Sequence, residues 1–287
     1  IEAMKSVMRI ILGSLLILLV AGCGAEKNKR DFIDRMEMEH ENDAPEANAA
    51  GERDPTAEVV TESVQYAEVG GETVTGYLAK PKGAESNLPG LIVIHEWWGL
   101  NDNIRMMARR LADQGYTALA VDLYYGKTAE TPDMAGKYAR QAGSNPDRAV
   151  ANLEQAYAYL TEQQNATSVG TIGWCFGGGW SLQAALAMPE KVDATVIYYG
   201  RLVTVPEQLE KLDMPILGIF GSEDQGIPPS EVNKFEAALN EAGVSNSIHI
   251  YEGANHAFAN PSGNRYKKEA AEDAWEKTVA FFKRHLE

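Results

Sequence analysis

The sequence predicts an α/β fold in which helices cover both faces of a mostly parallel β-sheet. From about residue 60 onward, short β-rich runs alternate with helical stretches of roughly 10–15 residues. Runs such as residues 91–94 (Leu-Ile-Val-Ile) are apolar throughout, as is typical of strands buried on both faces. Because parallel strands need crossover connections, the helices between them pack on the two faces of the sheet.

The predicted elements follow one another in a regular order. Two β-runs, residues 64–69 and 73–79, flank Gly70-Gly71, a typical hairpin turn. Further strands are expected at residues 91–94, 117–121, 168–172, 194–198, 215–220 and 247–251, and helices at residues 103–114, 146–163, 177–187, 229–242 and 265–285. The stretch between the strand 117–121 and the helix that begins at Pro146 is expected to be a variable connection.

The composition limits the class of protein and its partners. The chain has 287 residues, of which 45% are hydrophobic and 23% charged, as in soluble globular proteins with a large core. This excludes a wholly disordered chain and a multi-span membrane protein. The formal net charge is −15, so phosphate backbones repel the protein and we expect no nucleic-acid partner. Two cysteines are too few for a disulfide scaffold.

The first 23 residues are expected to be a targeting signal. Lys5 and Arg9 precede the apolar run 10–20, and residues 20–23 (Val-Ala-Gly-Cys) resemble a bacterial lipobox, in which the cysteine is lipidated. The alternative is an uncleaved anchor helix, although the run is shorter than the about 20 residues that span a bilayer. We therefore expect a bacterial envelope protein anchored in a membrane by lipid on Cys23. That membrane is the outer membrane, or the cytoplasmic membrane on its outer face.

Residues 24–60 are expected to be an acidic, flexible tether to a folded domain of residues 61–287. They include five basic and eleven acidic residues, and no apolar period is sustained. Such a segment is not expected to bury enough surface to offset its ordering entropy. His40 lies in this segment, so it is not expected at a catalytic site.

A candidate nucleophile lies where a predicted strand meets a predicted helix. Residues 173–177 (Gly-Trp-Cys-Phe-Gly) fit the G-x-nucleophile-x-G pattern, with Cys175 as the nucleophile. Glycines are needed on both sides because a Cβ there would collide with the strand and the helix. The positive end of the following helix dipole favours a thiolate at Cys175. The alternative is a buried structural cysteine beside a glycine-rich turn.

Asp224 and His256 follow later predicted strands, in the chain order nucleophile, acid, histidine that α/β hydrolases use. In this interpretation Cys175 attacks, His256 acts as a base and then as an acid, and Asp224 fixes the imidazole tautomer. Taken alone, an aspartate in a polar loop such as Asp224 is more often a turn residue, and Glu223 lies beside it.

The loop after the strand 91–94 is expected to complete the site. The backbone N–H groups of Phe176 and Trp97 are the candidate oxyanion donors. Glu96 lies in the same loop, where a carboxylate can hydrogen-bond the thiol or shift its proton equilibrium. The alternative is an exposed loop carboxylate. His95 and Glu96 do not begin an H-E-x-x-H zinc motif, because position 99 is glycine, so we expect no metal.

Together these motifs resemble the dienelactone hydrolase family of α/β hydrolases. The similar segments are residues 94–101, 115–116, 122–124, 173–178, Asp224 and 253–258. The resemblance implies a Cys-His-Asp triad, and a glutamate at position 96 that interacts with the resting thiol and helps to form the thiolate when substrate binds. It also implies hydrolysis of an enol-lactone or related small-molecule ester, through a thioester intermediate and without a cofactor.

One position departs from the family pattern. The family places an arginine four residues after the catalytic histidine to hold the substrate carboxylate, and here that residue is Asn260. Arg140 and Arg148 are the candidates for a second substrate-binding arginine. Because Asn260 offers no charge to a carboxylate, we expect neutral esters or lactones to be cleaved at least as well as a carboxylated one.

Two functions from different classes remain open at this point. One is an envelope-anchored hydrolase of esters or lactones, and the other is a non-catalytic lipoprotein that uses the same fold to bind a ligand or partner. The intact set of Cys175, Asp224 and His256 favours the hydrolase. Thioester or peptide-ester cleavage also remains open, because the triad specifies the reaction type whereas the pocket specifies the substrate.

Overall fold

Strands and helices alternate along the chain as the sequence predicts. The computed structural model describes residues 32–43, 58–84 and 87–287. The strands are β1 (Val59–Val69), β2 (Glu72–Pro81), β3 (Gly90–Ile94), β4 (Thr117–Val121), β5 (Val169–Trp174), β6 (Ala194–Tyr198), β7 (Ile216–Gly221) and β8 (Asn246–Tyr251). The helices are α2 (Asp102–Asp113), α3 (Pro132–Ser144), α4 (Pro146–Ala158), α5 (Phe176–Ala187), α6 (Pro206–Leu209), α7 (Pro229–Glu241) and α8 (Lys268–Leu286).

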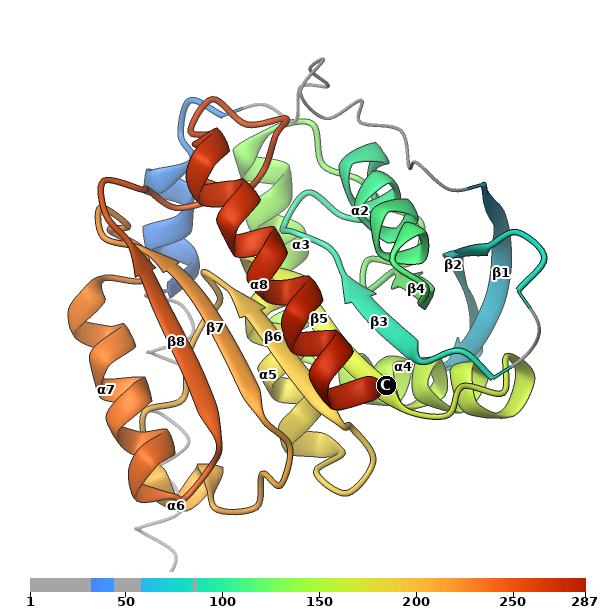
Figure 1. The fold of residues 1–287 in the computed structure, drawn as a ribbon. Coiled ribbons are helices and arrows are strands. Elements are labelled where there is room, and N and C mark those ends of the chain that lie inside the picture. Colours follow the sequence, from blue (N-terminus) through green and yellow to red (C-terminus); the bar gives the residue numbers. More distant parts are fainter. Residues whose placement is uncertain (1–31, 44–57, 85–86) are drawn as a thin grey trace, which may run out of the picture.

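One sheet with the strand order β1-β2-β4-β3-β5-β6-β7-β8 joins these elements (Figure 1). Strands β3 to β8 pair in parallel, whereas β1 and β2 form an antiparallel hairpin that joins β4 through β2. Helices α2 and α8 pack on one face, and α4 and α5 on the other (Figure 1). Every residue of β3 to β7 is buried, which explains why nearly all of their residues are apolar. The prediction of a mostly parallel sheet with helices on both faces is confirmed.

The variable connection after β4 contains a helix that the sequence analysis did not predict. Helix α3 begins after Thr131, whose side chain accepts a hydrogen bond from the Met134 N–H, and it has Pro132 in its first turn. Its buried residues are only alanines and a glycine, so its apolar periodicity is weak. The predicted helix 146–163 is found as α4 followed by a π-helical turn, Tyr159–Gln163.

Residues 32–43 form a segment that is packed against the domain, which we call the N-terminal segment. Residues 32–39 are helical, and Phe32, Met36 and His40 are buried at a spacing of four residues along one side. Met36 is 2% exposed, whereas Met38 on the other side is 78% exposed. The expectation of a flexible tether is therefore wrong for residues 32–43, because a short apolar stripe was hidden among many charges.

Ion pairs add to this packing. Glu37 lies 2.6 Å from Arg140 of α3, and Arg35 lies 3.5 Å from Glu231 of α7.

The predicted signal and lipidation site, residues 1–23, and the tether residues 24–31 and 44–57 lie outside the described residues. Within the described ranges, no helix combines the length and apolar character needed to span a membrane.

Candidate active site

Cys175 occupies a strained turn between β5 and α5. Its φ of 54° and ψ of −115° lie in a region that residues with a side chain rarely adopt. A Cβ at Gly173 would lie 2.1 Å from the Gly177 carbonyl oxygen, and a Cβ at Gly177 would lie 2.2 Å from the Ile94 carbonyl oxygen. The turn therefore requires glycine at both positions, as the motif predicts. Helix α5 starts directly after Cys175, so its N-terminus faces the sulfur.

His256 and Asp224 form a buried pair beside this turn. His256 Nδ1 lies 2.7 Å from Asp224 Oδ2, and both side chains are fully buried. The other carboxylate oxygen of Asp224 accepts a hydrogen bond from the Ile227 N–H, which fixes its orientation. An imidazole nitrogen of His256 and the Cys175 Sγ lie within 4.8 Å of each other. The loops after β7 and β8 thus bring the predicted acid and histidine to the predicted nucleophile.

The electrostatics of this group favour a protonated His256. Burial lowers the pKa of His256, but the Asp224 carboxylate and the charge of Cys175 outweigh it and raise this pKa to about 10. The imidazole is then a cation at neutral pH. A cationic imidazole beside a cysteine stabilises the thiolate, which is the nucleophilic form.

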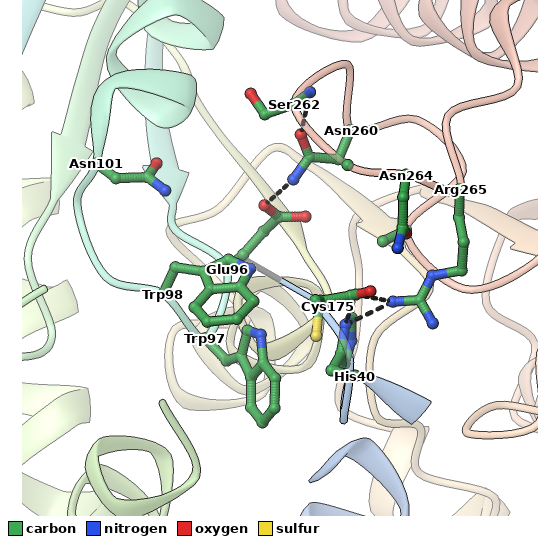
Figure 2. A pocket seen from close by; sticks show the side chains of 13 residues that line it. His40, Glu96, Trp97, Trp98, Asn101, Cys175, Asn260, Ser262, Asn264 and Arg265 are labelled. Carbon is green, nitrogen blue, oxygen red and sulfur yellow. Dashed lines mark hydrogen bonds and ion pairs between the residues drawn. The ribbon is translucent and has the colours of Figure 1, made fainter. Parts of the chain in front are cut away.

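Glu96 is buried, with 3% of its surface exposed, so the alternative of an exposed loop carboxylate is wrong. Its Oε2 accepts a hydrogen bond of 2.6 Å from Asn260 Nδ2, and the Asn103 side chain also hydrogen-bonds it. Figure 2 shows the carboxylate turned toward Asn260. In the described part of the chain, its partners are thus two amides rather than the Cys175 thiol that the family resemblance implies. Burial raises the pKa of Glu96 to about 7, against the opposing effects of His256, Arg265 and the amides.

The candidate oxyanion donors flank Cys175. Phe176 is the first residue of α5, where a backbone N–H has no partner inside the helix. Trp97 is buried in the loop after β3, and its indole Nε1 has no hydrogen-bond partner among the described residues. His95 has a structural role, because its Nδ1 donates to the Glu96 carbonyl and its Nε2 accepts from the Leu123 N–H.

The N-terminal segment closes the site. The ring of His40 lies 4.7 Å from that of Trp97 and 5.1 Å from that of His256, between centroids. Figure 2 shows His40 beside Cys175. The cavity that His40, Trp97 and Cys175 help to line has a volume of about 20 Å³, room for roughly one water molecule. A substrate therefore requires the segment to move.

His40 and Arg265 are site residues that the sequence analysis missed. Burial lowers the pKa of His40 to about 4, against the effect of Asp43, so this imidazole is neutral at pH 7. Arg265 donates to the Glu39 carbonyl at 2.6 Å and pairs with Asp43. The spacing of four from Met36 to His40 was the available signal for His40, whereas Arg265 lies in a loop without a pattern.

The two arginines proposed from the sequence lie elsewhere. Arg148 lies 2.6 Å from Glu72 and stacks over Tyr125, and Arg140 contacts Glu37 of the N-terminal segment. Neither lines the cavity beside Cys175.

The sheet order and the Cys175 turn define an enzyme of the α/β-hydrolase class, and comparison with known proteins makes this specific. The model of the dienelactone hydrolase family matches residues 74–286. The chain therefore belongs to the dienelactone hydrolase family, and it is a hydrolase.

Three relatives illustrate the likeness. "Protein usf" of Aquifex pyrophilus is 36% identical over 226 residues, which cover 76% of this chain and 96% of that protein. The "Putative carboxymethylenebutenolidase" of Saccharolobus solfataricus is 32% identical, over 75% of this chain and 95% of its own. Among solved structures, the "Putative Dienelactone Hydrolase" of Klebsiella pneumoniae superposes with a TM-score of 0.72 at 27% identity, covering 79% of this chain and all of the other.

The closed site predicts that loosening the N-terminal segment exposes Cys175. Met36→Asp places a carboxylate in an apolar contact against Gly226, which costs several kcal/mol and detaches the segment. We expect iodoacetamide to alkylate Cys175 at least about tenfold faster, since 1.4 kcal/mol corresponds to a factor of ten. Mass spectrometry of the Cys175 peptide measures the rate. Met38→Asp makes the same change on the exposed side and should leave the rate unchanged; equal rates in both variants would contradict the closure.

The raised pKa of Glu96 predicts a pH dependence of stability. The neutral carboxyl is favoured in the folded state, so its contribution is fully present below pH 4.5 and is lost as pH rises through 7. The loss amounts to about 3 kcal/mol at 1.36 kcal/mol per pH unit. The free energy of unfolding of wild type minus that of Glu96→Gln should fall by this amount between pH 4.5 and 8, measured in urea.

Glu154→Gln makes the same chemical change at an exposed position and is the control for this experiment. Parallel stability profiles for Glu96→Gln and wild type would show that Glu96 titrates as an ordinary carboxyl.

Proposed function

We propose that the protein hydrolyses a small-molecule ester or lactone through a covalent thioester on Cys175. The observation that carries this proposal is the buried His256–Asp224 pair, joined at 2.7 Å, beside a cysteine on a strained turn at a helix N-terminus. This arrangement supplies a nucleophile, a proton carrier and a group that orients the carrier.

The chemistry follows from the positions of these groups. The Cys175 thiolate attacks the carbonyl carbon, and the N–H groups of Phe176 and Trp97 hold the oxyanion that forms. His256 gives its proton to the leaving alkoxide, which departs as an alcohol, or stays attached to the acyl group if the substrate is a lactone. Water then attacks the thioester while His256 takes a proton from it, and the acid is released as the thiolate returns.

Alanine substitution tests this function. We expect Cys175→Ala and His256→Ala each to lower kcat for a chromogenic short-chain ester by about 10³-fold or more, the scale of losing a triad member. His249→Ala changes a histidine on β8 outside the site and serves as the control. A Cys175→Ala protein that keeps most of its activity would overturn the mechanism.

The substrate class is proposed from the relatives and from two side chains. Several relatives are named "Putative carboxymethylenebutenolidase", which supports a lactone or a related ester as the substrate. Asn260 is neutral and donates to Glu96, and the charge of Arg265 is balanced by Asp43. No unpaired cation lines the described cavity to recognise a substrate carboxylate.

We therefore expect neutral esters to be cleaved at least as well as carboxylated ones. The measurement is kcat/KM for two esters that differ only in a distal carboxylate. Asn260→Arg introduces the charge and should shift the ratio toward the carboxylated ester. A strong preference of wild type for the carboxylated ester would refute this expectation.

The location is proposed from the sequence of residues 1–23. The basic start, the apolar run and the lipobox-like residues 20–23 support lipidation of Cys23 and anchoring in the bacterial envelope. Metabolic palmitate labelling with membrane fractionation tests this, and Cys23→Ala should abolish both the label and the membrane association. Unlabelled wild-type protein in the cytoplasmic fraction would overturn the proposed location and leave the proposed chemistry untouched.

A further inference from the structure

The N-terminal segment brings a second histidine to the nucleophile. Cys175 Sγ and one imidazole nitrogen each of His40 and His256 all lie within 4.8 Å of one another, and the three side chains are buried. The buried Nε2 of His40 has no hydrogen-bond partner among the described residues, whereas His256 hydrogen-bonds Cys175. Buried imidazole nitrogens normally have a partner, so the unpartnered nitrogen of His40 beside the Cys175–His256 pair points to a ligand.

In both imidazoles the ring nitrogen Nδ1 contacts a carboxylate, as is typical of histidines that bind a metal through the other ring nitrogen. His256 Nδ1 lies 2.7 Å from Asp224 Oδ2, and His40 Nδ1 lies 2.6 Å from Asp43 Oδ2 and also 2.6 Å from Arg265 Nη2. A carboxylate that accepts from one ring nitrogen favours the tautomer whose lone pair lies on the other nitrogen, where a metal can bind it. The two contacts come from different parts of the chain and meet at the same sulfur.

We propose that Cys175, His256 and His40 bind one Zn²⁺ ion, which links the N-terminal segment to the catalytic pair. Thiolate and imidazole are ligands that zinc prefers, whereas Mg²⁺ and Ca²⁺ prefer oxygen. Zinc with Zn–N bonds near 2.05 Å and a Zn–S bond near 2.3 Å holds its ligand atoms roughly 3.3–3.7 Å apart. The three atoms must therefore approach by about 1.5 Å at most, which small movements of the segment and rotations of the rings allow.

The cavity beside Cys175 supplies the fourth position. Its volume of about 20 Å³ suits one water molecule, and three protein ligands plus one water is a common zinc coordination. Zinc binding displaces the proton from Nε2 of the His256 imidazolium, and this proton passes to the solvent. A thiolate bound to zinc does not attack a carbonyl, and an imidazole bound through Nε2 does not carry a proton. Zinc therefore inhibits hydrolysis and holds the segment closed, and removal of the ion releases both.

The test measures zinc binding to the metal-free full chain by competition with a chromophoric zinc indicator. We expect one Zn²⁺ per chain. Changes of outer partners of zinc ligands weaken binding 10–100-fold, so loss of a ligand in Cys175→Ser or His40→Ala should weaken it by at least about 100-fold. The matched controls are Cys23→Ser and His249→Ala, which remove the other cysteine and a histidine of β8 and should bind zinc as wild type does.

Two further measurements keep the proposal testable if His40→Ala folds poorly. Co²⁺ bound to wild type should show a thiolate-to-metal charge-transfer band and the intense visible bands of four-coordinate cobalt, and the first should be absent in Cys175→Ser. Asp43→Asn keeps the imidazole and should weaken zinc binding by about 10–100-fold.

Because binding is measured without substrate, its outcome is separate from that of the proposed function. Wild-type zinc affinity in a folded His40→Ala protein would overturn the proposal, since the ion would then bind Cys175 and His256 without the segment. Absence of binding in wild type would overturn it as well. If the protein cleaves esters, Zn²⁺ but not Mg²⁺ should inhibit the reaction, and a chelator should restore it.

Discussion

The close approach of three backbone stretches around Cys175 is the constraint on which the site depends. The Gly177 backbone packs against the carbonyl oxygen of Ile94 at the end of β3, and Gly173 packs against Gly177 itself. This contact sets the N-terminus of α5 beside the loop that carries Glu96 and Trp97. Because parallel strands end at the same edge of the sheet, the loops after β7 and β8 reach the same place with Asp224 and His256.

Burial of several ionisable groups in one small site works only because each has a partner. Asp224 balances the charge of His256, whereas Glu96 has two amides and is half neutral near pH 7. Isolated charges in such a place would be expelled or neutralised. The N-terminal segment extends the same arrangement, since Asp43 balances Arg265 at the rim and keeps His40 in place.

The parts of the fold that sequence predicts are those with local causes. The apolar runs of β3 to β7 and the glycines at 173 and 177 follow from burial and from sterics that act within a few residues. The order of Asp224 and His256 is predictable because the topology brings the ends of successive strands together. Helix α3 was missed because alanine and glycine on its buried side give little contrast.

The position of His40 has a different cause. Its segment lies far in sequence from its partners, by 225 residues in the contact of His40 with Arg265, and only the tertiary structure brings them together. Charge composition alone predicted an unstructured stretch, yet three buried residues at a spacing of four, held by ion pairs, are enough to fix it. The segment contributes no strand to the sheet, but it covers a nucleophilic cysteine, a residue that oxidises readily when it is exposed as a thiolate. Closure therefore protects Cys175 but also keeps substrate away from it. Catalysis requires that the contacts of Met36 and His40 break more easily than those of the core.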